Sequence, residues 1–150
     1  MLEAVLTGAV AGGTCIVFAG LGEIVAERSG VINLGTEGSM LCGALAAYAV
    51  GIETGNPWLG VVAGLLAGAL LAAVHAVLVL HRGANQIAVG LVVSFLGIGI
   101  TALFGQDYVG QGVVPLTTWD VPLLSKLPFL GPVLFQHDPL TYLSFLAVPF

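Results

Sequence analysis

The segment Asn33-Leu-Gly-Thr-Glu-Gly-Ser39 holds the side chains of this sequence that are best able to do chemistry. An amide, two hydroxyls and a carboxylate can bind a polar solute or a cation, and the same groups can cap the end of a helix. Asn33 or Thr36 could cap a helix that starts here. Glu37 would then lie in the first turn, where the helix dipole favours a negative charge.

Two interpretations of this segment stay open. In the first, it is a capped, buried helix start in which Glu37 is satisfied locally. In the second, Gly35 and Gly38 permit an irregular backbone, which a membrane tolerates only where protein or a water-filled cavity surrounds it. A broken helix of this kind would line a solute route, and an intramembrane carboxylate indicates function by default. The candidate residues of that route are Asn33, Thr36, Glu37 and Ser39.

Glu23 and Glu27 precede this segment, with Arg28 beside them. Like charges four residues apart on a helix repel, so a compensating group is expected nearby. We interpret these residues as a charge cluster that anchors a helix end at the membrane interface.

Other reactive side chains form no recognisable site. His75 and His81 are six residues apart, so they do not share a helix face and are a poor metal pair. The single lysine, Lys126, is followed by Leu127, which excludes a phosphate-binding loop of the Gly-x-x-x-x-Gly-Lys-Ser/Thr type. We expect no catalytic residue, no metal site and no cofactor on this chain. ATP and magnesium, if they drive it, would bind a partner subunit.

The composition places these residues in a membrane protein. Of 150 residues, 58% are hydrophobic and 7% are charged, whereas soluble domains are about 45–50% apolar and about 25% charged. This excludes a water-soluble enzyme domain and a disordered tail. Three basic residues are too few to neutralise the phosphates of a nucleic acid, so we expect the lipid bilayer, and no nucleic acid, as a partner.

Charge-free runs long enough for a transmembrane helix, which needs about 20 apolar residues, cover residues 4–22, 54–74 and 83–106. The run over residues 38–52 is shorter, at about 22 Å for a rise of 1.5 Å per residue. It is either a half-helix or a helix that begins earlier and carries Glu37 into the membrane. Another apolar run starts at Pro139 and covers residues 139–150.

The predicted fold is therefore an all-α, polytopic membrane helix bundle. It has four complete transmembrane helices, the start of a fifth, and a broken or short second helix. We interpret residues 1–150 as the N-terminal part of a longer transmembrane domain.

Arg28 and Arg82 fall in alternate loops, hence on the same side of the membrane, and the positive-inside rule makes that side cytoplasmic. The N-terminus and the loop around residues 53–56 are then outside. Residues 107–138 lie outside as well, and four prolines prevent a regular spanning helix there. This segment is expected to be an interfacial loop or a short re-entrant piece, or else a docking site for a soluble extracytoplasmic partner.

Small residues indicate where helices pack. Glycines four residues apart share a helix face and let a neighbouring backbone approach closely, inside the chain or at a subunit interface. The glycines with this spacing are Gly8, Gly12, Gly60, Gly64 and Gly68. The hydroxyl of Ser94, in the fourth run, either bonds to its own helix backbone or lines a polar route.

A family resemblance appears in Glu23 through Met40, read with the preceding glycine as Gly-Glu-x-x-x-Glu-Arg-Ser-Gly-Val-Ile-Asn-Leu-Gly-Thr-Glu-Gly-Ser-Met. It resembles the permease subunits of ABC importers for nucleosides and simple sugars, within the broader ribose and branched-chain amino-acid permease group. Gly83-Ala-Asn-Gln-Ile and residues 127–140 are similar to the same branch. The chain departs from the family pattern at Gln86, where a Glu is expected in many relatives, so no role that requires a charge is expected there.

The resemblance implies a multi-pass subunit of the plasma or inner membrane, of which these 150 residues are about half, the C-terminal half being absent. It implies a second permease subunit (a copy or a paralogue), cytoplasmic ATP-binding subunits that hold ATP and magnesium, and an extracytoplasmic solute-binding lipoprotein. The chain would supply the translocation pathway and no catalysis. The family motif carries over to Asn33, Thr36, Glu37 and Ser39.

Two other functions fit the same residues. One is an ion-coupled secondary transporter that uses Glu37 as its proton or sodium site. The other is a non-transporting membrane scaffold, for which the glycine faces would suffice.

Overall fold

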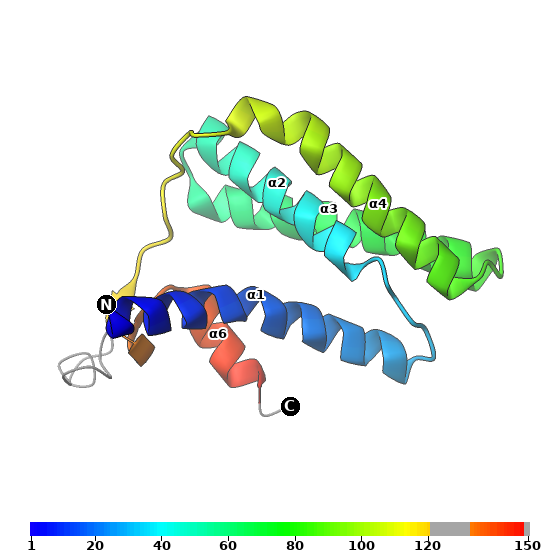
Figure 1. Ribbon diagram of the computed structural model, residues 1–150, viewed down its shortest axis with the longest axis horizontal. Helices are drawn as coiled ribbons and strands as arrows, with labels where there is room; N and C mark the ends of the chain where they lie inside the picture. Colours follow the sequence, from blue (N-terminus) through cyan, green and yellow to red (C-terminus); the bar gives the residue numbers. More distant parts are fainter. Residues whose placement is uncertain (121–132, 149–150) are drawn as a thin grey trace. The chain divides into compact units, whose positions relative to one another are not determined.

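The computed structural model describes residues 1–120 and 133–148, and most of them are helical (Figure 1). The elements are α1 (Leu2–Arg28), α2 (Thr36–Thr54), α3 (Pro57–Ala76), the π-helical turn η1 (Val77–His81), α4 (Gln86–Phe104), the 3-10 turn η2 (Gly105–Tyr108), β1 (Trp119–Asp120), β2 (Gln136–His137) and α6 (Pro139–Ala147). The predicted all-α class is confirmed.

Among the described residues, three helical segments are long and apolar enough to cross a membrane: Leu2–Arg28, Pro57–His81 and Gln86–Tyr108. They contain the three long charge-free runs, apart from the first residues of the 54–74 run and of the 83–106 run. The chain divides into two compact units, one formed by Met1–Gly22 with Leu116–Phe150 and the other by Glu23–Pro115. Each unit is described by itself below.

The second helix is not broken. α2 runs without interruption from Thr36 to Thr54, so the predicted break is wrong. Its 19 residues correspond to about 28 Å at 1.5 Å per residue, close to the ~30 Å core of a bilayer. The helix begins before Gly38 and includes Glu37, because a carboxylate in a first turn favours a helix rather than ending it. The irregular backbone lies just before the helix, in residues 29–35.

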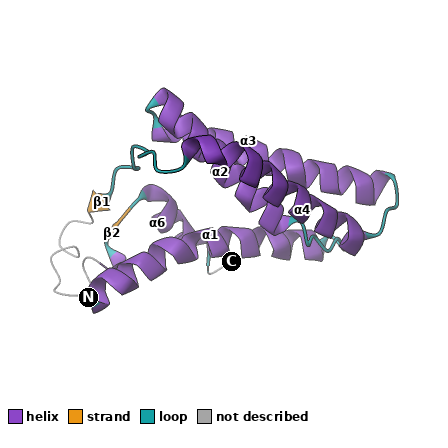
Figure 2. Ribbon diagram, turned by 45° about the horizontal axis from the view of Figure 1, so that its top comes forward, coloured by secondary structure: helices purple, strands orange, loops and turns teal. Residues whose placement is uncertain are grey.

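In the Glu23–Pro115 unit, α2 packs against both α3 and α4 (Figures 1 and 2). Glycines make these contacts close. A Cβ atom on Gly64 would lie 2.9 Å from the carbonyl oxygen of Gly43, and one on Gly97 would collide with the backbone of Gly38. Because no side chain larger than hydrogen fits there, the helix backbones touch directly.

Local signals set the helix ends of this unit. The N–H of Gly30 bonds to the carbonyl of Glu27 and that of Val31 to Ala26, a Schellman motif with Gly30 at a positive φ of 84°. Asn56 caps α3 by accepting from Trp58 N at 3.0 Å, and Asn85 caps α4 by accepting from Ala88 N at 3.1 Å.

In the other unit, Asp138 caps α6 and Pro139 occupies the first turn. The hydroxyl of Thr14 in α1 donates to the hydroxyl of Thr141 in α6 at 3.4 Å. Strands β1 and β2 pair antiparallel, with Trp119 opposite His137. Residues 109–118 are not helical, as the proline content predicted. Pro122, Pro128 and Pro132 lie outside the described residues.

Candidate functional site

The polar loop, defined here as residues 29–35 between α1 and α2, is held mainly by side chains. A backbone that leaves helix geometry near apolar surroundings must find other partners for its N–H and carbonyl groups. Here the partners come from the end of α1, from α4 and from the loop itself. They define the candidate site.

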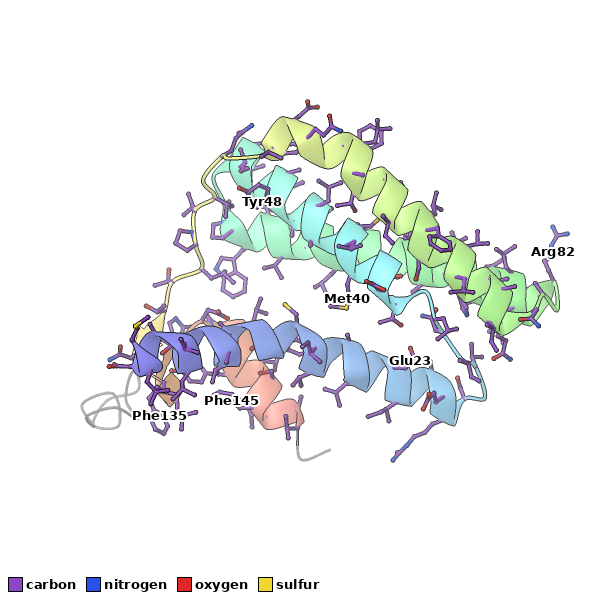
Figure 3. The ribbon with its side chains drawn as sticks, in the orientation of Figure 1. Glu23, Met40, Tyr48, Arg82, Phe135 and Phe145 are labelled. Atoms are coloured by element: carbon purple, nitrogen blue, oxygen red, sulfur yellow. The ribbon has the colours of Figure 1, made fainter. Side chains whose placement is uncertain are left out.

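Glu23 of α1 binds the far end of this loop with one carboxylate oxygen and the first residue of α2 with the other. Oε1 accepts from the backbone N–H of Asn33 at 3.1 Å, and Oε2 accepts from the hydroxyl of Thr36 at 2.8 Å. The Thr36 hydroxyl also lies 3.0 Å from the carbonyl of Asn33, but it has one proton, and the shorter bond to a charged acceptor is the stronger one. In Figure 3, Glu23 extends from the last turns of α1.

Two side chains of α4 hold the middle of the loop. Gln86 Oε1 accepts from Ile32 N at 2.7 Å, and its Nε2 lies 3.4 Å from the carbonyl oxygen of Gly30. The buried hydroxyl of Ser94 donates to the carbonyl of Leu34 at 2.7 Å. Gly90 makes room for this contact, because a Cβ there would lie 2.8 Å from Leu34 N.

The predicted helix caps are wrong. Gly35, which has no side chain, is the N-cap residue of α2. The side chain of Asn33 turns back on the loop, where Oδ1 accepts from Gly35 N at 2.9 Å, and Thr36 is bound to Glu23. The backbone N–H and the hydroxyl of Ser39 both donate to the carbonyl of Gly35, at 3.0 and 3.2 Å.

Glu37 lies apart from this network. Its side chain is exposed, and no hydrogen-bond partner for its carboxylate is found in the part of the chain that the structure describes. Met40 and Ala44, three and seven residues further along α2, are exposed as well. These spacings put the three residues on one helix face. We call this face the open stripe of α2 (Glu37, Met40, Ala44); Met40 is labelled in Figure 3.

The five glycines predicted to pack against a neighbouring helix differ in what lies next to them. Gly60 and Gly64 lie against the backbone of α2 at Ala47 and Gly43, and a Cβ on Gly68 would lie 3.5 Å from Ser39 O. By contrast, outside the surrounding helix backbone, no atom of residues 1–120 or 133–148 lies within 4 Å of a Cβ built on Gly8 or Gly12. A packing role for those two glycines stays a prediction.

A second set of contacts lies at the opposite end of α2. The hydroxyl of Tyr108 donates to Glu53 at 2.7 Å, and that of Tyr48 donates to the carbonyl of Gln111. Since Gln86 binds the polar loop, the turns that carry Arg28 and Arg82 lie at one end of this unit, and Glu53 lies at the other. No local pattern in the sequence indicates either tyrosine contact, because each joins residues more than 50 positions apart.

Two principal ligands of the polar loop were not predicted from the sequence. Glu23 had a signal in the sequence, since its repulsion with Glu27 predicted a compensating group nearby. The groups that bind its carboxylate are the backbone N–H of Asn33 and the hydroxyl of Thr36. Gln86 had none beyond its polarity. Among the described residues, no group of three or more His, Cys, Asp or Glu side chains could hold a metal ion. The arrangement holds backbone in place beside an unpaired carboxylate.

Comparison with known proteins identifies the family of this chain. Residues 5–147 match the family model described as the branched-chain amino acid transport system permease component. The chain is 40% identical, over 96% of its length, to a protein of Haloferax volcanii that is provisionally named a glucose ABC transporter permease. It is 31% identical, over 90%, to the nucleoside ABC transporter permease protein of Lactococcus lactis subsp. cremoris. It is 30% identical, over 89%, to the guanosine ABC transporter permease protein of Bacillus subtilis.

The chain spans less than half the length of these curated relatives, from 44% to 45%. No solved structure matches it. A family match that covers nearly every residue, together with the apolar helices, decides the classification. The chain belongs to the family of permease components of branched-chain amino acid transport systems.

Proposed function

We propose that residues 1–150 form the N-terminal part of the translocation-pathway subunit of an ATP-driven importer for nucleosides or simple sugars. The observation that carries this proposal is the similarity, over at least 89% of the chain, to three proteins named as permeases for glucose, nucleosides and guanosine. The three long apolar helices support a multi-pass location in the plasma or inner membrane.

We propose four complete spans and the start of a fifth. The spans are α1, α2, α3 with η1, and α4, and α6 begins the fifth. The uninterrupted length of α2 supports its place among them. The end that carries Arg28 and Arg82 would be cytoplasmic by the positive-inside rule, which places the N-terminus, Glu53 and Tyr108 outside.

The partners follow from the family. We propose a second permease subunit (a copy or a paralogue), cytoplasmic ATP-binding subunits that hold ATP and magnesium, and an extracytoplasmic solute-binding lipoprotein. The lipid bilayer would cover apolar side chains that are 65–69% exposed on the outer faces of α3 and α4: Leu65, Leu66, Leu70 and Phe95. Leaving that much apolar surface in water would be unfavourable.

Within the pathway, we propose that Glu37 faces the solute and that the other predicted residues shape the route. The hydrogen-bonding groups of Asn33, Thr36, Ser39 and Ser94 are engaged with the polar loop or with Glu23. Glu37 is free to bind, and an intramembrane carboxylate without a partner is costly unless it is functional or hydrated. The open stripe of α2 extends this surface along the helix.

The test is uptake by the full-length permease, reconstituted with its partner subunits in vesicles. ATP should drive accumulation of a labelled nucleoside or sugar, and collapse of the proton and sodium gradients should leave it intact. Loss of uptake on gradient collapse, with ATP present, would instead support an ion-coupled transporter that uses Glu37. If uptake is the same without the permease, the proposal is wrong and a scaffold role is favoured.

A further inference from the structure

Two neighbouring backbone N–H groups of the polar loop are bound by side chains from two different helices. Ile32 N donates to Gln86 of α4 at 2.7 Å, and Asn33 N donates to Glu23 of α1 at 3.1 Å. The loop is therefore hydrogen-bonded to α1 and to α4 at two consecutive residues. Its position depends on both ligands, because a shift towards either helix stretches the other bond.

The carboxamide of Gln86 accepts one hydrogen bond from the loop and donates another to it. A backbone N–H can only donate, so the atom that faces Ile32 N must be the amide oxygen, and the NH₂ group must then face the carbonyl of Gly30 at 3.4 Å. A neutral amide satisfies both loop groups at once. Ionised carboxylate oxygens accept but cannot donate.

We propose that Gln86 is a positioning residue of the translocation pathway. Its neutral amide fixes the polar loop against α4. By holding the loop, it also determines the position of the first residues of α2 and of the open stripe that starts at Glu37. The expected effect of Gln86 on transport rests on the proposed function. The structural part of the inference, that Gln86 restrains Ile32 and Gly30, rests only on its two contacts.

The charge introduced by the substitution Gln86→Glu would matter because charged groups already surround this end of the unit. They are Glu23, Glu27 and Arg28 at the end of α1, Glu37 at the start of α2, and Arg82, with the titratable His81, before α4. The ionised carboxylate of this variant would lose the bond to Gly30 O and would face Glu23 across adjacent N–H groups. Once protonated, the new side chain would carry an O–H that can donate again. The substitution should therefore be tolerated better at low pH than at high pH.

The experiment compares wild type, Gln86→Glu, Gln86→Met and the matched control Gln106→Glu in the reconstituted full-length importer. Gln106 lies just beyond the other end of α4 and its side chain is exposed. Hydrogen exchange of peptides that cover residues 29–35 and ATP-dependent uptake are measured across a series of pH values. Gln86→Met keeps the shape of the side chain and removes both bonds.

We expect exchange in the loop to accelerate about five- to ten-fold in Gln86→Met, where Ile32 N loses its acceptor, the effect of losing about one hydrogen bond. The acceleration should be smaller in Gln86→Glu, whose carboxylate can still accept from Ile32 N, and exchange in α2–α4 should stay unchanged in both variants. Uptake by Gln86→Glu should fall several-fold at neutral pH and recover as the pH is lowered, whereas Gln106→Glu should follow wild type. Wild-type exchange in both Gln86 variants, or equal acceleration throughout the protein, would overturn the proposal. So would a Gln86→Glu uptake profile parallel to that of wild type. Absence of uptake by the wild type itself would count against the proposed function, and the exchange data would still decide the role of Gln86.

Discussion

The carboxylate of Glu23 and the hydroxyl of Thr36 lie 2.8 Å apart across 13 residues of chain. This bond closes the connection between α1 and α2, and it places the first residue of α2 directly beside the last turns of α1. With Asn33 N on its other oxygen, Glu23 joins both the loop and the side chain of the first residue of α2 to the end of α1. An acidic residue that the sequence indicated as an interfacial charge is thus a structural ligand of the loop.

Replacing Glu23 with Ala should destabilise the protein by about 1–3 kcal/mol, because the N–H of Asn33 and the hydroxyl of Thr36 lose a charged acceptor. The measurement is the midpoint of thermal unfolding of the purified permease. Glu27→Ala is the matched control, since Glu27 lies four residues further along the same helix and is exposed. If both variants shift the midpoint equally, the bonds of Glu23 contribute no specific stability.

Gly97 and Gly8 should respond oppositely to substitution with Ala. At Gly97 the added methyl group would collide with the backbone of Gly38, so the helices must separate at a cost of about 1–3 kcal/mol. At Gly8 nothing described lies within 4 Å, and the better helix propensity of Ala should stabilise the protein by up to about 1 kcal/mol. The midpoint of thermal unfolding checks both values. A loss of stability in Gly8→Ala would show that another chain segment or subunit packs on that face.

His75 is a buried polar residue with unsatisfied ring nitrogens. It is 2% exposed, and neither nitrogen has a hydrogen-bond partner among the described residues. Its position, seven residues after Gly68, puts it near the glycine face of α3 that packs on α2. Since a buried unpaired polar group costs about 1–3 kcal/mol, His75→Leu should raise the midpoint of unfolding, while the exposed-site control His81→Leu should change it little. A lower midpoint for His75→Leu would mean that the ring has a partner elsewhere in the assembled protein.

Most of the helical architecture could be predicted from the sequence, because long charge-free runs have few alternatives in a membrane. The packing face of Gly60, Gly64 and Gly68 could be located by spacing alone, although spacing cannot say what lies opposite, as Gly8 and Gly12 show. The break in the second helix was a wrong prediction because charged residues were used as helix boundaries. A carboxylate in a first turn does not end a helix.

The loop network could not be predicted, since its ligands are distant in sequence. Ser94 bonds to a carbonyl 60 residues away, and Gln86 binds Ile32 across 54 residues. Local rules assigned Asn33 and Thr36 to helix capping, a function that side chains of their type often have. Tertiary contacts gave these residues other partners. Only the neighbouring like charges of Glu23 and Glu27 indicated that one of these side chains binds a group distant in sequence.

Whether the open stripe of α2 faces an aqueous solute route can be decided by the reactivity of single cysteines with a small water-soluble thiol reagent. Cys15 and Cys42 are first replaced by Ala in the full-length permease, assembled with its partners in vesicles. Cysteines are then placed at Glu37, Met40 and Ala44. A further cysteine at Leu66, which is 67% exposed on α3, serves as the lipid-facing control. We expect the three α2 positions to react and to be protected by transported solute, while position 66 stays unreactive. Reactivity at Met40 and Ala44 no higher than at Leu66 would show that this face of α2 lines no aqueous route.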